Sequence, residues 1–225
     1  DGLTIPPGEA FFFQLNLFDM RSGVIAYLVL TFAQLGREGL GPGRGRAVLR
    51  EVSHAGRRLY DGETLLFKEP PAPLELSLDP PPRPIERLTV RFVTPTELKS
   101  GQKLAGHPEF GVLAARIRDR LSTLRELYDE GPLPIDFRAF GERAARIQMT
   151  RCALGHVDIL RRSSRTGQTH PIGGFTGEAD YEGDLTEFVP YLEAARWTGV
   201  GRQTVWGKGE IEVQVLPEGY PVLRV

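Results

Sequence analysis

Residues 197–216 read Trp-Thr-Gly-Val-Gly-Arg-Gln-Thr-Val-Trp-Gly-Lys-Gly-Glu-Ile-Glu-Val-Gln-Val-Leu. The stretch follows a helical pattern over 186–197 and then passes through four glycines within 199–209. Beyond them the chain alternates, with Ile211, Val213 and Val215 on one face. Alternation at every second residue predicts a strand over 210–216. The order is therefore helix, glycine-rich loop, strand.

This order excludes two familiar nucleotide-binding loops. A dinucleotide-binding loop runs from a strand through glycines into a helix, which is the opposite order. A Walker loop needs Ser or Thr after the lysine, whereas Lys208 is followed by Gly209. Bare glycine amides beside Arg202 and Lys208 could still bind a phosphate, and Trp206 could stack on a base. The alternative is a tight loop that packs a helix onto a sheet.

The chain before this loop supplies the rest of a domain. Apolar residues three and four positions apart predict a helix over 110–128, with Phe110, Leu113 and Ile117 on its buried face. Alternating patterns predict strands over 87–93, 144–151, 155–161 and 174–182. Residues 86–216 therefore follow the order β-α-β-β-α-β, which is that of a ferredoxin-like domain in the α+β class.

A proline-rich segment separates this domain from the residues before it. Residues 68–84 hold seven of the eighteen prolines, so we expect a stiff linker over 68–85 between residues 1–67 and 86–225. Residues 1–67 yield only β-α-β: a strand over 11–17, a buried helix over 24–33 and a strand over 47–52. A second glycine-rich run, 36–46, precedes the last strand.

The two parts align as an internal repeat at a constant offset of 164 residues. Tyr27-Leu28 falls on Tyr191-Leu192, and Gly43-Arg44-Gly45 falls on Gly207-Lys208-Gly209. Chance is the alternative, because glycine is common in this chain. The repeat predicts tandem ferredoxin-like (RRM-like) domains, the first of which is incomplete at its N-terminus. We therefore expect an N-terminal portion of that domain to be missing from this chain.

The glycine-rich loop 199–209, preceded by a helix and followed by a strand, resembles the signature loop of the RAMP superfamily of CRISPR-associated proteins. Residues 173–185, Gly-Gly-Phe-Thr-Gly-Glu-Ala-Asp-Tyr-Glu-Gly-Asp-Leu, resemble one branch of it, the sixth Cas family. Its members are endoribonucleases that cut precursor CRISPR RNA within the repeat. The resemblance covers most of residues 8–216 and is strongest over 173–213. Thr198 departs from it, since relatives often have His there.

Composition excludes several classes of protein. Cys152 is the only cysteine, so an internal disulfide and a cysteine zinc site are excluded, and a reducing, cytoplasmic location is expected. The longest apolar stretch, 23–33, is about half of the roughly 20 residues that span a bilayer. The net charge of −1 indicates no overall basic excess. No spacing of Asp, Glu and His suggests a metal site, and no cofactor is expected.

Charge is nevertheless partitioned along the chain. Residues 138–171 hold seven arginines and two acids, whereas residues 174–195 hold six acids and neither Lys nor Arg. The basic stretch suits a phosphodiester backbone; the alternative is a solvated surface that the acidic stretch partly neutralises. The residues that we expect to hold the backbone are Arg44, Arg46, Arg146, Arg161, Arg162, Arg165, Gly199, Gly201, Arg202, Gln203, Thr204, Gly207, Lys208 and Gly209.

Metal-free RNA cleavage needs groups that transfer protons near neutral pH, and histidine is suited to this. Of the four histidines, His170 lies in the basic loop and is the candidate catalytic residue. The family resemblance implies a general base other than His170. Many relatives carry the general base in the opening β-α-β of the first domain, and others use Lys, Arg or Tyr, so the base is expected outside these 225 residues.

The resemblance implies a metal-independent endoribonuclease in which the 2′-hydroxyl attacks the adjacent phosphate of the repeat. Two alternatives remain open: a non-catalytic RAMP subunit that binds guide RNA in a CRISPR effector complex, and a ferredoxin-like enzyme for a small phosphorylated metabolite. The expected partners are CRISPR repeat RNA and other effector subunits, with no membrane contact.

Overall fold

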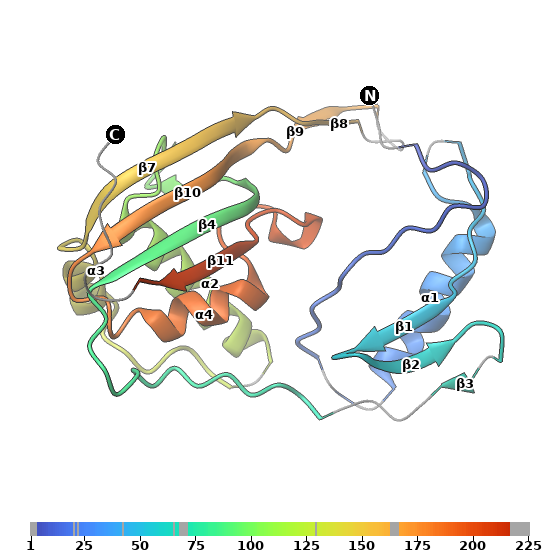
Figure 1. Ribbon diagram of the computed structural model, residues 1–225, viewed down its shortest axis with the longest axis horizontal. Helices are drawn as coiled ribbons and strands as arrows, with labels where there is room; N and C mark the ends of the chain where they lie inside the picture. The colour runs from blue at the N-terminus through green and yellow to red at the C-terminus, as the bar shows by residue number, and fades with distance from the viewer. Residues whose placement is uncertain are drawn as a thin grey trace.

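The computed structural model describes residues 4–19, 21, 23–41, 43–64, 66–67, 72–128, 130–162 and 167–216. The fold is α+β with antiparallel sheets. Figure 1 shows two groups of elements, joined by residues 72–86, which have no regular secondary structure. Within the described residues, no helix is both long and apolar enough to cross a bilayer.

The larger group is built on a four-stranded sheet. Its strands are β4 (Arg87–Thr96), β7 (Gln148–Val157), β10 (Gly174–Glu182) and β11 (Ile211–Val215), in the spatial order β11-β4-β10-β7. Helix α2 (Phe110–Leu127) follows β4, and α4 (Val189–Thr198) follows β10. The predicted order β-α-β-β-α-β is thus confirmed for this sheet and its two helices.

The core lies between the sheet and these helices. Leu88, Val90 and Phe92 of β4 are at most 1% exposed, as their alternation predicts. Phe110 and Ile117 of α2 meet them and are equally buried. Full burial of one such side chain contributes roughly 1.5–3 kcal/mol, so this two-sided burial stabilises the group.

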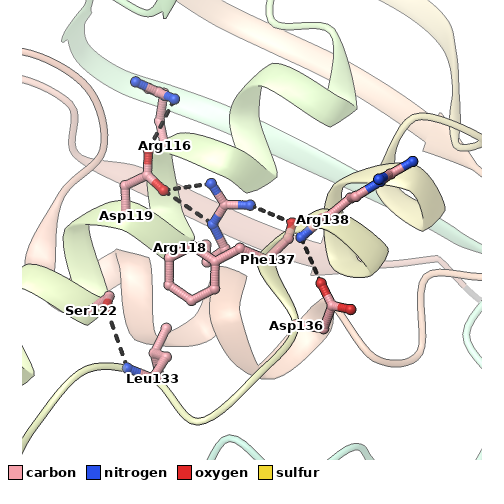
Figure 2. A network of polar contacts seen from close by, with 8 residues as sticks. All are labelled: Arg116, Arg118, Asp119, Ser122, Leu133, Asp136, Phe137 and Arg138. Atoms are coloured by element: carbon pink, nitrogen blue, oxygen red, sulfur yellow. Dashed lines mark hydrogen bonds and ion pairs between the residues drawn. The ribbon is translucent and has the colours of Figure 1, made fainter.

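Between α2 and β7 lies a helix that the sequence analysis missed, α3 (Phe137–Ala144). The Asp136 carboxylate accepts hydrogen bonds from the backbone amides of Arg138 and Ala139 and so caps the helix. Figure 2 shows how the connection is held. Arg118 donates to the carbonyl oxygen of Phe137 at 2.8 Å and stacks on its ring, 4.3 Å from the centroid. The predicted strand 144–151 is therefore wrong at its start, because α3 occupies residues up to Ala144.

The second predicted strand, 155–161, is also corrected. Strand β7 continues to Val157 because it pairs with β10 along its whole length. A short strand, β8 (Leu160–Arg162), then pairs with β9 (Thr169–Pro171). A further hairpin, β5 (Lys99–Ser100) with β6 (Lys103–Leu104), precedes α2. The prediction for 174–182 is confirmed by β10.

The smaller group consists of α1 (Val24–Glu38) and a sheet of β1 (Glu51–His54), β2 (Arg57–Asp61) and β3 (Leu66–Phe67). The predicted helix is present, but the expectation that it is buried is wrong, because Tyr27 is 70% exposed and Leu30 is 68% exposed. The strand expected over 47–52 begins later, at Glu51.

The predicted strand over 11–17 is not formed. Residues 11–19 pair with no other strand among the described residues, so the alternation of their apolar side chains has no ladder to support it. The segment instead connects the two groups. Phe13 packs on Phe32 of α1, while the Asn16 side chain donates to the carbonyl oxygen of Trp197 at 2.8 Å and Phe18 meets Tyr128.

Candidate functional site

The glycine-rich loop 199–209 begins at the end of α4 and contains a short 3-10 helix, η1 (Thr204–Trp206). Gly199, Gly201, Gly207 and Gly209 all have positive φ, where side chains are strained. At Gly209 the space is closed as well, because an added Cβ would lie 1.9 Å from the carbonyl oxygen of Val200. Glycine is required here by the fold of the loop itself.

Several amides of this loop bond to protein. The Arg202 amide donates to the carbonyl oxygen of Glu97 at 3.0 Å, and that of Gly209 donates to Pro95 at 3.2 Å. Within the loop, the Val200 amide donates to Gly209 at 2.9 Å. These amides are therefore engaged with the end of β4 and with one another, and the expectation of a row of bare amides is corrected for them.

Lys208 lies inside the molecule, at 4% exposure. Its Nζ donates to the carbonyl oxygen of Gly173 at 2.6 Å and to Gln203 Oε1 at 3.0 Å, and it lies 3.6 Å from Glu97 Oε2. The ammonium group thus joins the loop to Glu97, directly after β4, and to Gly173, directly before β10. In this arrangement it binds protein groups and stabilises the loop.

Glu97 is the residue that sequence reasoning missed. Its carboxylate binds both Lys208 and Arg202, and its carbonyl oxygen accepts from the Arg202 amide. A single acid after a strand carries no sequence signal of such a role. The Arg202 side chain itself is about half exposed, so of the two loop cations only Arg202 lies at the surface.

The basic residues beyond the loop lie far apart. Arg146 is exposed in the turn before β7, whereas Arg161 and Arg162 are on β8, past the far end of that strand. Strand β7 has ten residues, about 33 Å, so the structure does not bring Arg146 together with them. The backbone of His170 pairs with that of Arg161 on the β8–β9 hairpin. The side chains of these β8 and β9 residues, and Arg165 as a whole, lie outside the described part.

The charge partition seen along the sequence is neutralised in part in space. The acidic strand β10 lies between β4 and β7, and its carboxylates meet their arginines. Arg151 of β7 lies 3.3 Å from Glu178 and 3.5 Å from Asp180. These hydrogen bonds and charges raise the pKa of the Arg151 guanidinium above its ordinary value. Arg87 pairs in the same way with Glu182, so this sheet is no uniformly basic surface.

Of the arginines of α2, Arg118, Arg120 and Arg125 bind segments outside the helix, whereas Arg116 pairs with Asp119 of the same helix. The Arg120 guanidinium donates to the carbonyl oxygen of Thr198 at 3.4 Å, and burial lowers its pKa. Arg125 donates to the carbonyl oxygens of Glu130 and Gly131.

In the smaller group, the second glycine-rich run forms an exposed hairpin tip. The backbones of Leu40 and Gly45 are bonded in both directions, at 2.8 and 3.0 Å. Arg44 and Arg46 are exposed beside this bridge, and Arg44 adopts a positive φ of 52°. These two predicted residues are placed where a polyanion can reach them.

The histidines with described side chains lie on different elements. His107 Nδ1 is 3.6 Å from Cys152 Sγ, and His156 Nε2 is 3.2 Å from Asp158, while His54 ends β1. No group of three or more His, Cys, Asp or Glu that could hold a metal ion occurs in the part that the structure describes.

A hollow of about 740 Å³, open to solvent, lies at the edge of the larger group. Its wall consists of prolines 81, 82 and 84 with Glu86, Glu182, Gly183, Asp184 and Thr186. Three carboxylates in one wall repel a phosphate group, so this hollow does not favour a phosphorylated metabolite.

Comparison with known proteins places the larger group in a family. The family model of the CRISPR-associated endoribonuclease Cas6 matches residues 90–211. A second family model, described as an N-terminal domain, matches residues 2–72. No curated protein matches the chain.

Solved structures that match the chain include Cas6 proteins. Thermus thermophilus Cas6 is 22% identical, with a TM-score of 0.45 over 59% of this chain and 55% of that one. A Cas6 product complex is 21% identical, with a TM-score of 0.46 over 86% and 73%. A partial Cas6-RT-Cas1–Cas2 complex is 13% identical, with a TM-score of 0.43 over 63% and 24%. The chain thus spans about half the length of the Thermus thermophilus protein.

Proposed function

The chain belongs to the Cas6 family of CRISPR-associated endoribonucleases, and from this premise we propose that it binds and cleaves precursor CRISPR RNA within the repeat. The observation that carries the proposal is the family match over residues 90–211, which includes the central strands, α2, α4 and the loop 199–209.

The proposed reaction needs no metal. A base takes the proton of the 2′-hydroxyl, the 2′-oxygen attacks the adjacent phosphorus, and the 5′-oxygen leaves with a proton from an acid. The products are a 2′,3′-cyclic phosphate and a 5′-hydroxyl. His170 is the residue that we propose for one of the two proton transfers.

The proposed RNA-binding residues fall into two sets. Arg44, Arg46, Arg146 and Arg202 are exposed and reach the backbone phosphates directly, together with Arg161, Arg162 and Arg165. Gly199, Gly201, Gln203, Thr204, Gly207, Lys208 and Gly209 act mainly through the shape of the loop. The burial of Lys208 and the bonded amides of Arg202 and Gly209 support this division.

We further propose that residues 1–67 are the C-terminal part of a first ferredoxin-like module and residues 86–225 a second module, joined by the linker 68–85. The strand order β11-β4-β10-β7 supports this architecture for the second module. For the first, the support is the repeat: α1 aligns with α4, and the Gly43–Gly45 tip aligns with Gly207–Gly209.

The test is an incubation of the protein with end-labelled CRISPR repeat RNA in EDTA, followed by a denaturing gel. The expected result is a single cut that leaves a 2′,3′-cyclic phosphate at the end of the upstream product. A repeat in which the 2′-hydroxyl next to the cut is replaced by hydrogen is the matched control and should stay intact. Cleavage that requires a divalent ion contradicts the proposed chemistry.

The same gel distinguishes a second candidate, a RAMP subunit that binds guide RNA without cutting it. One observation favours this candidate: the described histidines are spread over separate elements, at His54, His107 and His156. Tight binding of the repeat without any cut, in an assay of the whole protein, would establish it.

A further inference from the structure

The short hairpin of β5 and β6, between β4 and α2, has no role in the site described so far. Its strands pair Lys99 with Leu104 and Ser100 with Lys103, so only residues 101 and 102 form the turn. Gly101 has a φ of 59°, and two-residue hairpin turns favour glycine at such a position. The hairpin is therefore a narrow, defined ribbon.

The base of the hairpin lies against the core and against the loop 199–209. Leu98, directly before β5, is fully buried. Gly201 of the loop approaches it closely, because a Cβ added there would lie 2.5 Å from the carbonyl oxygen of Glu97 and 3.2 Å from the Leu98 side chain. Lys99 is the next residue, so the hairpin begins directly beside the glycine-rich loop.

The hairpin carries two cations and no acid. Residues 98–106 contain Lys99 and Lys103 but neither Asp nor Glu. Lys103 is exposed and Lys99 is half-buried, and neither ammonium group forms a hydrogen bond or an ion pair with the described part of the chain. The acid directly before the hairpin, Glu97, is already engaged by the two cations of the loop 199–209. The two charges of the ribbon are therefore open to an anion from outside.

Most other cations of the larger group are engaged by protein. Among the described side chains of residues 86–216, all but Arg146 and the two hairpin lysines bond to an acid or to a carbonyl oxygen. Arg146 lies before the start of β7. The hairpin lies toward the opposite end of that strand, where Phe175 of β10 pairs with Thr96 and His156.

We propose that the hairpin 99–104 binds the phosphodiester backbone of the repeat RNA through Lys99 and Lys103, beside Arg202. The inference rests on the proposed function of the chain. Paired residues share a face and successive residues alternate, so the two lysines project from opposite faces of the ribbon. Each ammonium group sits on a flexible four-carbon stem, which lets one RNA strand that crosses the ribbon contact both. Unlike Arg202, neither lysine has to leave a carboxylate before it binds a phosphate.

A protein with an acidic surface is the alternative ligand for two free cations. A protein interface needs an apolar centre, and the hairpin offers only one large exposed apolar side chain, Leu104. The endoribonuclease family match over residues 90–211 includes the hairpin as well as the adjoining loop. Both observations favour RNA.

The test measures the affinity of the whole protein for a repeat RNA that carries 2′-hydrogen at the cut, by fluorescence anisotropy at several salt concentrations. The double variant Lys99→Gln, Lys103→Gln should reduce the slope of log affinity against log salt by about 1.4. Its binding near 0.1 M salt should be weaker by roughly tenfold. The double variant Lys99→Arg, Lys103→Arg keeps both charges and should retain the slope.

A matched control removes the same total charge from cations that are already paired. Arg91→Gln with Arg138→Gln is suitable, because these exposed arginines pair with Glu212 and Glu142. This variant should retain the slope of the parent. Circular dichroism of each variant shows whether a weaker affinity reflects the lost contact or a lost fold.

Lysine acetylation gives a second readout that does not depend on affinity. The chain has only four lysines, so mass spectrometry can follow each of them. Bound RNA should protect Lys99 and Lys103 from acetylation. Lys208 is 4% exposed and should react little with or without RNA.

Several outcomes overturn the proposal. If the parent binds or cuts the repeat while the glutamine variant keeps its slope, or if RNA leaves both lysines open to acetylation, the hairpin is not a contact and the proposed function stands. An equal loss of slope in the arginine control would assign the effect to overall charge. A parent that neither binds nor cuts the repeat refutes the proposed function, and this inference with it.

Discussion

The two glycine-rich loops of this chain align at Gly43-Arg44-Gly45 and Gly207-Lys208-Gly209, yet they differ in how the cation between the last two glycines is used. In loop 199–209 this cation is Lys208, which is buried and bonded to Gly173, Gln203 and Glu97. In loop 36–46 it is Arg44, which is exposed at a hairpin tip.

The glycines differ in the same way. An added Cβ at Gly209 meets the carbonyl oxygen of Val200 at 1.9 Å, whereas at the aligned Gly45 the nearest atom is 4.0 Å away. The comparison teaches that the Lys208–Gly209 end of one loop is part of the packing of its sheet and helix, whereas the aligned Arg44–Gly45 tip of the other lies at the surface. The start of that second run is packed as well, since an added Cβ at Gly36 or Gly39 would meet a backbone carbonyl oxygen. Similar residues at aligned positions thus have a structural role in the larger group and a proposed RNA-binding role in the smaller group.

The largest expected effect is that of Gly209→Ala. Both the positive φ of 75° and the contact with Val200 must be relieved, so we expect a loss of about 3 kcal/mol or more in the free energy of unfolding. Urea denaturation followed by tryptophan fluorescence is the measurement, because both tryptophans, 197 and 206, lie at this loop.

Two glycine variants serve as controls. Gly207→Ala has open space around the added Cβ but a positive φ, so it should cost only about 1–2 kcal/mol. Gly45→Ala, followed by circular dichroism, should change stability by less than about 0.5 kcal/mol. Equal losses in the free energy of unfolding for Gly209→Ala and Gly45→Ala would contradict the difference between the two loops.

The next effect is that of Lys208→Met. The substitution retains most of the apolar stem but leaves Glu97, which is 16% exposed, without a buried counter-charge. Removing one partner of a buried ion pair costs about 3 kcal/mol, and we expect a value near this in urea denaturation. Arg44→Met should be close to neutral in the same measurement by circular dichroism. A neutral Lys208→Met would show that the buried contacts of this lysine contribute little.

The sequence predicted the larger group well because its patterns reflect burial. The stripe on α2 and the alternation in β4, β10 and β11 arise from one sheet packed on two helices, so periodicity located them. The same rule failed for residues 11–17, whose alternation has no strand beside it. It also failed for 144–146, where α3, capped at its start by Asp136, ends at Ala144 and a turn precedes β7.

The site was harder to predict than the fold. The burial of Lys208 depends on Glu97, more than a hundred residues earlier, and on the carbonyl oxygen of Gly173. The separation of Arg146 from Arg161 depends on the length of one strand. Likewise, the acidic stretch neutralises arginines that are distant in sequence, because sheet order and not chain order sets the neighbours. These contacts and separations depend on tertiary structure, which local sequence patterns do not contain.

The salt dependence of RNA affinity tests the proposed binding role of the exposed tip of the loop 36–46. If Arg44 and Arg46 each contact a phosphate, the double alanine variant should reduce the slope of log affinity against log salt by about 1.4. The affinity itself should fall by roughly tenfold near 0.1 M salt. Fluorescence anisotropy with a repeat RNA that carries 2′-hydrogen at the cut measures both. Lys208→Met, studied where it remains folded, should leave the slope unchanged. A reduced slope for this variant would indicate that the lysine does reach the RNA.

The smallest effect is expected for Arg202→Gln. Arg202 shares the Glu97 carboxylate with Lys208, but its side chain is about half exposed, so solvent screens the pair. Exposed ion pairs contribute about 0–1 kcal/mol, and we expect a loss of about 0.5 kcal/mol in urea denaturation that vanishes at 0.5 M salt. A loss as large as that of Lys208→Met, unaffected by salt, would contradict this. Both cations of the loop would then be structural, and phosphate contact would depend on the arginines outside it.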